Sequence, residues 1–153
     1  MMKKILLFFV TMLFVLTTQS FTLAAEDKPP LPYFGNGATV QDLGNGEYVV
    51  KTEGAKDEEG FVYTAPKPFT TEKIQVQVSL KGQGTVMLKI SETTARGQFI
   101  REERLPIQLT EEWKTYSVPY ELASTTSQID VSIVTQSKEQ VQYTFKDLVV
   151  KEQ

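Results

Sequence analysis

The side chains that could do chemistry in this chain are carboxylates, lysines, tyrosines and amides, because its 153 residues include no histidine and no cysteine. Histidine is the usual general base near neutral pH and the commonest ligand of transition metals. Serine–histidine and cysteine–histidine catalysis are therefore excluded, together with disulfide bonds and a lipid-modified cysteine. Any acid–base chemistry would have to come from carboxylates, lysines or tyrosines, and the sequence offers the carboxylate pairs Glu102-Glu103 and Glu111-Glu112.

Neither carboxylate pair predicts a glycosidase. Adjacent residues of a strand point to opposite faces of a sheet, so the two carboxyl groups of each pair do not face one substrate. Glycoside hydrolysis needs two carboxyl groups about 5 to 9.5 Å apart across a cleft. The charged run Lys56-Asp57-Glu58-Glu59 is typical of a solvated loop. We expect a protein that is not an enzyme.

The elements that must position these side chains are strands. In the segment 73–81, Ile74, Val76, Val78 and Leu80 share one face, which is the two-residue period of a strand. Gly82-Gln83-Gly84 then predicts a hairpin into a second strand, 85–92. Further strands are expected at 47–52, 61–64, 99–109 (with an irregularity at Pro106), 114–122, 128–135 and 141–151. About eight strands, each with one apolar face, predict an all-β antiparallel β-sandwich or jelly roll.

The first 25 residues have the order of a secretory signal peptide. Met1-Met2-Lys3-Lys4 precedes the apolar run 5–16, and Ala24-Ala25 supplies small residues at the end. The alternative is an uncleaved anchor, which needs about 20 apolar residues, and the polar stretch 17–20 interrupts the run too early. We therefore expect a secreted, extracellular protein with a signal peptide (1–25), a proline-rich linker (26–32) and a single folded domain (33–153).

The charge of the mature chain limits its partners. Cleavage would leave 14 basic against 19 acidic side chains. Nucleic-acid binding depends on neutralising a phosphate backbone, and an acidic chain without a basic stripe does not do this. The same charge argues against an anionic membrane surface, so we expect no nucleic acid and no membrane among the partners.

Three segments resemble a known group of proteins. Leu109–Val118 contains a threonine, a tryptophan and then a strand, the strands 73–81 and 85–92 precede it, and Tyr143–Val150 carries an aromatic, an aspartate and an apolar run. Together these resemble the extracellular carbohydrate-binding modules of the galactose-binding-like jelly-roll group, the type appended to xylanases and glucanases. The resemblance implies a non-catalytic protein that binds a polysaccharide or cell-wall glycan, with Trp113 packed structurally.

The resemblance also bears on metal binding. The closing segment of that group often carries paired acidic residues at a structural calcium site, whereas here Lys146 precedes Asp147 and leaves one carboxylate. Asp147 with loop carbonyl oxygens could still supply calcium ligands, since calcium binds hard oxygen atoms. No other cofactor is expected.

A sugar site needs an aromatic ring and planar polar groups on one exposed surface. If the apolar residues of 73–81 and 85–92 point inward, Gln75, Gln77, Met87 and Lys89 form one outward platform. The same alternation could extend it to Arg101 and Gln142, and Arg96 would lie at its rim. Among the aromatic residues, positions near loops or outside the apolar register favour Tyr63, Phe99, Tyr120 and Tyr143. The candidate binding residues are Gln75, Gln77, Lys89, Arg96, Phe99, Arg101, Tyr120 and Tyr143.

Two other functions remain open at this point. The same fold could serve as a protein-interaction or structural module of the cell envelope, with an extracellular protein partner and no sugar recognition. A third alternative is a secreted inhibitor or accessory subunit of a hydrolase. An apolar exposed sheet face without aromatic residues would favour the protein-interaction module.

Overall fold

The computed structural model describes residues 31–153; the expected signal peptide (1–25) and residues 26–30 of the expected linker lie outside the described residues. We find in the described part no helical segment with the length and apolar character needed to traverse a lipid bilayer. Ten strands are present there: β1 (Tyr33–Asn36), β2 (Ala38–Gly44), β3 (Glu47–Thr52), β4 (Gly60–Thr64), β5 (Lys73–Gly82), β6 (Thr85–Thr93), β7 (Phe99–Gln108), β8 (Lys114–Glu121), β9 (Gln128–Val134) and β10 (Gln142–Glu152).

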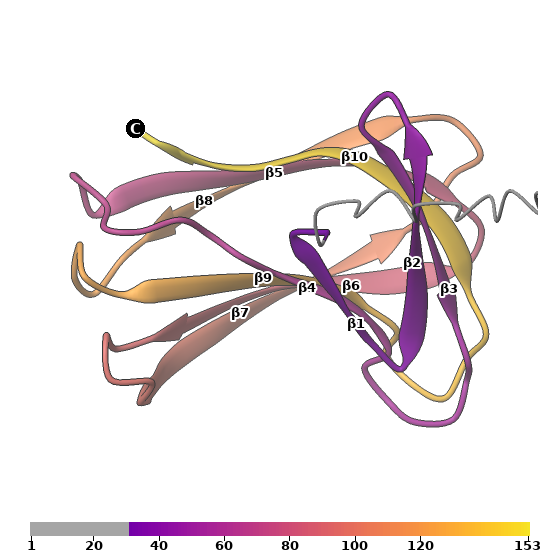
Figure 1. Cartoon of the computed structure of the whole chain (residues 1–153), viewed down its shortest axis with the longest axis horizontal. Helices are drawn as coiled ribbons and strands as arrows, with labels where there is room; N and C mark the ends of the chain where they lie inside the picture. Colours follow the sequence, from indigo (N-terminus) through magenta and orange to yellow (C-terminus); the bar gives the residue numbers. More distant parts are fainter. Residues whose placement is uncertain (1–30) are drawn as a thin grey trace, which may run out of the picture.

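The strands form two antiparallel sheets of five strands each, stacked as a sandwich (Figure 1). One sheet has the order β1-β4-β9-β6-β7 and is called the β4 sheet here; the other has the order β2-β3-β10-β5-β8 and is called the β5 sheet. Figure 1 shows β5, β8 and β10 in one layer above β6, β7 and β9 in the other. The predicted all-β sandwich of the jelly-roll type is confirmed.

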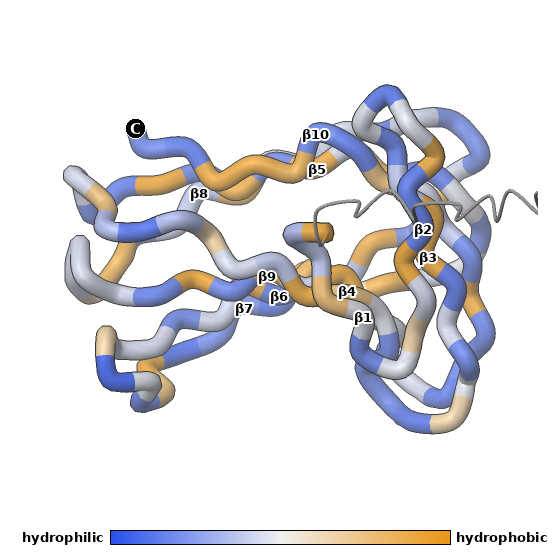
Figure 2. Tube along the Cα trace, viewed as in Figure 1, coloured by the Kyte–Doolittle hydropathy of each residue, from blue (hydrophilic) through white to orange (hydrophobic). Residues whose placement is uncertain are grey.

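The core lies between the two sheets because each strand turns one apolar face inward. Ile74, Val76 and Val78 of β5 are fully buried, as are Val131 and Ile133 of β9. Phe61 of β4 stacks on Phe145 of β10 with ring centroids 4.2 Å apart, so this aromatic pair bridges the sheets. In Figure 2 the apolar residues follow the strands, whereas the connecting loops are mostly hydrophilic.

The predicted hairpin between β5 and β6 is wrong. β5 pairs with β10 and β8, whereas β6 pairs with β7 and β9, so the chain crosses from one sheet to the other at Gly82-Gln83-Gly84. The crossing is fixed by the β7–β8 connection: the Gly82 N–H donates to Thr110 O at 2.8 Å, and the Leu109 N–H donates to Gly84 O at 2.9 Å. Outward residues of β5 and β6 therefore lie on opposite faces of the molecule.

Two smaller expectations also differ from the structure. The eight predicted strands correspond to β3 through β10, and β1 and β2 were missed. Pro106 continues the pairing of β7 with β6 without a shift, and the irregularity falls instead between Glu92 and Thr93. Pro106 is tolerated because β7 is the edge strand of its sheet.

The β3–β4 loop is organised around a buried carboxylate. Glu59 is 0% exposed, and the backbone N–H groups of Gly54, Ala55 and Lys56 donate to its carboxylate at 2.6, 2.8 and 2.8 Å. Burial alone would raise the pKa of Glu59, but these N–H donors hold its pKa below the ordinary value. The expectation of a solvated charged run at 56–59 is therefore wrong at Glu59, which folds its own loop.

This arrangement predicts acid sensitivity. The pKa of Glu59 is lower in the folded protein than the ordinary 4.5, so its charge contributes stability that is fully present above about pH 4.5 and is lost as the pH falls through the folded pKa. Glu59→Gln lacks the charged acceptor and should melt roughly 5 °C or more below the parent at neutral pH. It should also lose less stability between about pH 5 and 3, as measured by urea unfolding at each pH.

Glu112→Gln is the matched control for this acid test, because Glu112 is an exposed glutamate outside the strands. It should reproduce both the melting temperature and the pH profile of the parent. A Glu59→Gln profile parallel to the parent's at every pH would show that the loop does not depend on this carboxylate.

Candidate functional site

The predicted outward platform is divided between two faces. Gln75 and Gln77 are half-buried on the outer face of the β5 sheet, where they lie opposite Pro119 and Ser117 of β8. Lys89 lies on the outer face of the β4 sheet, opposite Arg104 of β7. The amide pair and the lysine cannot contact one ligand, since the core separates them.

Two of the predicted aromatic ligands are buried. Tyr143 is 1% exposed, and its hydroxyl donates to Ile133 O of the facing sheet at 2.7 Å. Tyr120 is 4% exposed, its hydroxyl donates to Glu92 Oε2 at 3.1 Å, and the Arg101 guanidinium covers its ring at 4.5 Å. Burial, together with the Glu92 carboxylate, raises the pKa of Tyr120 to about 12. Neither ring can stack on a sugar, so both predictions are corrected.

The remaining candidates are spread along the molecule. The structure brings Arg101 together with Tyr120, where Arg101 Nε also pairs with Glu92 Oε2 at 3.3 Å, so this arginine closes the sandwich edge between β7 and β8. Arg96 and Phe99 lie at the exposed β6–β7 hairpin, and Phe99 is 69% exposed. The strands that flank this hairpin, β6 and β7, belong to the β4 sheet, whereas Gln75 and Gln77 lie on β5 of the other sheet.

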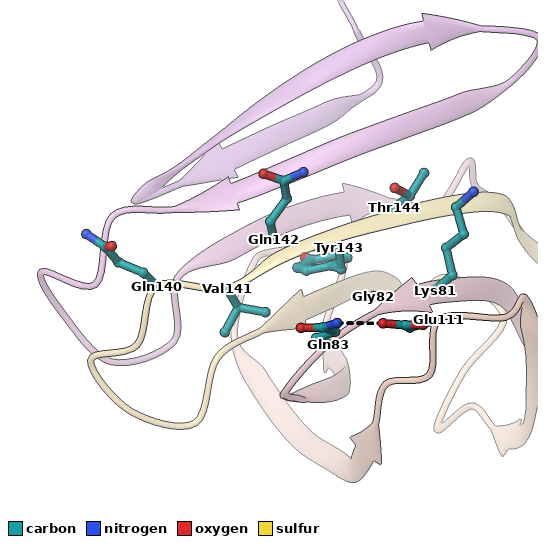
Figure 3. A pocket seen from close by; sticks show the side chains of 9 residues that line it. All are labelled: Lys81, Gly82, Gln83, Glu111, Gln140, Val141, Gln142, Tyr143 and Thr144. Atoms are coloured by element: carbon teal, nitrogen blue, oxygen red, sulfur yellow. Dashed lines mark hydrogen bonds between the residues drawn. The ribbon is translucent and has the colours of Figure 1, made fainter.

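A polar hollow lies where β5 and β10 meet the loops at one end of the sandwich. Its volume is about 460 Å³, which is within the range of small-ligand sites. Figure 3 shows Lys81, Gln142 and Thr144 pointing to one side of their strands, as alternation requires, with Tyr143 on the other side. The residues that line this hollow, called the amide hollow here, are Lys81, Gly82, Gln83, Glu111, Gln140, Val141, Gln142, Tyr143 and Thr144.

The polar groups of the amide hollow are partly ordered before any ligand arrives. Gln83 Nε2 donates to Glu111 Oε1 at 2.6 Å, which joins the inter-sheet crossing to the β7–β8 loop (Figure 3). Gln140 Nε2 donates to Glu53 O at 3.2 Å and fixes the opposite wall. Amide and carboxylate groups held this way can hydrogen-bond paired hydroxyl groups.

Trp113 is linked to the amide hollow through Lys81. Its ring lies under the ammonium groups of Lys81 and Lys146, whose nitrogens are 4.6 and 4.3 Å from the ring centroid. Lys81 also lines the hollow, and Lys146 is paired with Glu47 at 3.5 Å. Trp113 is half-buried and stands outside the apolar core, so the chain's single tryptophan is held on the surface by two cation–π contacts.

Of the residues that line this hollow, sequence reasoning named Gln142, as an extension of the platform, and Tyr143, whose ring proves to be buried. A signal for Lys81 was present, because the alternation of β5 puts it on the same face as Gln75 and Gln77. Gln83 and Glu111 could not be found this way, since their meeting depends on the inter-sheet crossing.

The structure adds little to the proposed calcium ligand. Asp147 is exposed, with φ 54°, at the register shift of β10. Among residues 31–153 no three acidic side chains gather in a way that could hold a metal ion. Calcium binding at Asp147 stays a prediction.

Solved structures that share this fold include carbohydrate-binding modules. The family 11 module of cellulosomal cellulase Lic26A-Cel5E of Clostridium thermocellum matches with a TM-score of 0.60 at 14% identity, over 80% of this chain and 88% of that chain. Endo-1,4-β-D-xylanase 10B of the same organism, solved as CBM22-1 and GH10 modules with xylohexaose, matches with a TM-score of 0.61 at 18% identity, over 80% and 26%. TmCBM61, solved with β-1,4-galactotriose, matches with a TM-score of 0.51 at 16% identity, over 79% and 87%.

No protein-family model matches the sequence, and no curated protein is significantly similar to it. The structural matches nevertheless define the class of fold: this chain has the jelly roll of carbohydrate-binding modules, as the sequence resemblance implied. At such low identity the likeness concerns the fold alone.

Proposed function

We propose that this protein is a secreted, non-catalytic carbohydrate-binding protein that holds a polysaccharide in the amide hollow beside Trp113. The observation that carries the proposal is that Lys81, which lines the hollow together with amide, carboxylate and hydroxyl side chains, also contacts the ring of the half-buried Trp113. An aromatic ring accepts the apolar face of a sugar, and planar polar groups bind its hydroxyls. A sugar that stacks on Trp113 must displace the Lys81 and Lys146 ammonium groups that cover the ring, and lysine side chains are long enough to move aside. The expected signal peptide supports secretion.

The geometry favours a neutral sugar chain that lies across an open surface. The hollow combines one ammonium, one carboxylate and three amide side chains, so no single charge dominates it. It lies on the outer face of the β5 sheet, where the Gln142 side chain is exposed. The solved structures of xylanase 10B and TmCBM61 contain xylohexaose and β-1,4-galactotriose, and these ligands supply a first panel of probes.

The test is binding to a panel of plant, microbial and host polysaccharides by affinity electrophoresis, followed by titration of Trp113 fluorescence. Trp113 is the single tryptophan of the chain, so a sugar that stacks on it should change the emission directly. Gln142→Ala should weaken binding about threefold, and Trp113→Ala about tenfold or more, which corresponds to about 1.4 kcal/mol.

Gln75→Ala is the matched control, because Gln75 lies on the same outer face of the same sheet but outside the amide hollow. It should bind as the parent does. If Gln75→Ala loses binding and Gln142→Ala keeps it, the ligand lies along β5 instead. A folded parent that binds no polysaccharide of the panel would overturn the proposal and favour the protein-interaction module.

A further inference from the structure

The outer face of the β4 sheet carries two cations that share a carboxylate from a loop. Lys89 of β6 and Arg104 of β7 lie opposite each other in the strand register. Glu58 of the β3–β4 loop bridges them, with Oε2 at 2.7 Å from Lys89 Nζ and Oε1 at 2.9 Å from Arg104 NH1. This face is on the opposite side of the sandwich from the amide hollow.

A second carboxylate binds the same cations from within the sheet. Glu102 of β7 lies 2.6 Å from Arg104 Nε and 3.4 Å from Lys89 Nζ, and Ser91 Oγ donates to it at 2.8 Å. Glu102 therefore belongs to the sheet itself, whereas Glu58 reaches the cations from outside it. Two cations with one resident carboxylate retain a net positive charge for one more anion.

The backbone of the loop is held without the Glu58 side chain. Glu59 organises the loop through three backbone N–H groups, and the Glu59 N–H and C=O are bonded to Thr135 at 3.1 and 2.8 Å. Glu58 is 38% exposed, so it can swing into solvent while the loop stays in place. Arg104 is 50% exposed and Lys89 11% exposed, and removal of Glu58 would open both to an incoming group.

We propose that Lys89 and Arg104 form a second saccharide site, which takes the carboxylate of a uronate sugar in the position that Glu58 fills in this structure. The guanidinium of Arg104 suits a carboxylate because its N–H groups match two oxygens. Glu58 acts as an internal competitor that a uronate must displace. The assignment rests on the proposed saccharide-binding function.

The surroundings favour a sugar over a simple carboxylate. The neighbouring outward row of the sheet carries Ser91, Asp130 and Thr64 on adjacent strands, and Thr64 Oγ1 donates to Asp130 Oδ1 at 2.6 Å. These hydroxyl and carboxylate groups can donate to and accept from ring hydroxyls. On the opposite side, Met87 and Pro106 form a less polar row.

The experiment compares trigalacturonate with neutral galactotriose by calorimetric titration of the full protein. Glu58→Gln removes the competing charge and keeps the shape of the side chain, so it should bind trigalacturonate about tenfold more tightly than the parent does. Galactotriose affinity should not change. Adding Arg104→Gln to Glu58→Gln should abolish the gain, and raising the salt concentration from about 0.05 to 0.5 M should weaken trigalacturonate binding.

Two exposed residues supply charge-matched controls. Arg96→Gln removes a cation at the β6–β7 hairpin, and Glu112→Gln removes a carboxylate near β8; neither should alter trigalacturonate binding by more than about twofold, since both are remote from Lys89 and screened. Melting curves should place Glu58→Gln within a few degrees of the parent. Equal affinity of folded Glu58→Gln and parent for trigalacturonate overturns this second site.

The two proposals fail in different ways. If neutral polysaccharides bind and respond to Gln142→Ala while Glu58→Gln gains nothing, only the uronate site is wrong. If trigalacturonate binds Glu58→Gln tightly and no neutral polysaccharide binds, the amide hollow is wrong and the uronate site stands. If Glu58→Gln binds galactotriose and trigalacturonate more tightly than the parent by the same factor, Glu58 blocks the face sterically and the site does not recognise a carboxylate.

Discussion

Gly60→Ala should destabilise the fold severely, by at least about 4 kcal/mol of a total that is about 5–15 kcal/mol for ordinary domains. A Cβ atom at Gly60 would lie 1.9 Å from Ile133 O and 2.9 Å from Val134 Cα, and both are backbone atoms of the paired strand β9. β4 cannot move away, because the neighbouring Glu59 is hydrogen-bonded through its backbone to Thr135. Its carboxylate also accepts a hydrogen bond from the Gly54 N–H of the β3–β4 loop. Circular dichroism and urea unfolding measure the effect.

Gly97→Ala isolates the other reason for which a position can require glycine, namely its backbone angle. Gly97 has a φ of 78° at the β6–β7 hairpin, and a Cβ there would meet nothing within 4 Å. It should cost only about 1 kcal/mol, the ordinary penalty for a side chain in the left-handed region. If Gly60→Ala unfolds at the same urea concentration as Gly97→Ala, the β4–β9 contact is not as close as described.

Strands could be predicted where buried and solvent-facing residues alternate along the sequence. β5 and β6 bury every second residue over most of their length, so the alternation of Ile74, Val76 and Val78 was enough to find β5. β1 and β2 are edge strands of their sheets, and neither has a fully buried residue. Their inward face is too weakly apolar to stand out, and for that reason both were missed.

The sheet to which a strand belongs could not be read from local pattern. Gly82-Gln83-Gly84 between two alternating segments is equally compatible with a hairpin and with a crossing between sheets. The crossing is selected by hydrogen bonds to Thr110 and Leu109, about 27 residues further along the chain. Because the platform of Gln75 and Lys89 depended on the hairpin, it failed together with it.

Among the aromatic residues, the burial of one could be predicted from the sequence, whereas the positions of two others depend on distant residues. Tyr143 has the same parity along β10 as Phe145, so the period of two already placed both in the core. The burial of Tyr120 was less accessible to sequence reasoning, because its hydroxyl is bound by Glu92, 28 residues away in the chain and in the other sheet. The surface position of Trp113 likewise depends on Lys146 from β10.

Glu92 holds the two sheets together at their open edge, and this role accounts for two residues that sequence analysis assigned to ligand binding. The Glu92 side chain is 0% exposed, and its oxygens accept from Tyr120 Oη at 3.1 Å, Arg101 Nε at 3.3 Å and the Ala123 N–H at 2.7 Å. Arg101 in turn donates to Glu121 O. One buried carboxylate therefore joins β6 and β7 of the β4 sheet to β8 of the β5 sheet and to the β8–β9 loop.

Glu92→Ala should lower the free energy of unfolding by about 2–4 kcal/mol, because hydrogen bonds to a charged group contribute roughly 1.5–3 kcal/mol each and a buried Tyr120 hydroxyl is left without its acceptor. The contribution of Arg101 is discounted, since its side chain is 44% exposed. Arg101→Gln should therefore cost less than about 1 kcal/mol and Tyr120→Phe about 1 kcal/mol.

Urea unfolding gives all three values, and polysaccharide titration of the two milder variants should match the parent. If the stability of Glu92→Ala lies within about 1 kcal/mol of the parent's, Glu92 does not hold the two sheets together. If stable Arg101→Gln loses polysaccharide binding, this edge becomes a ligand site again.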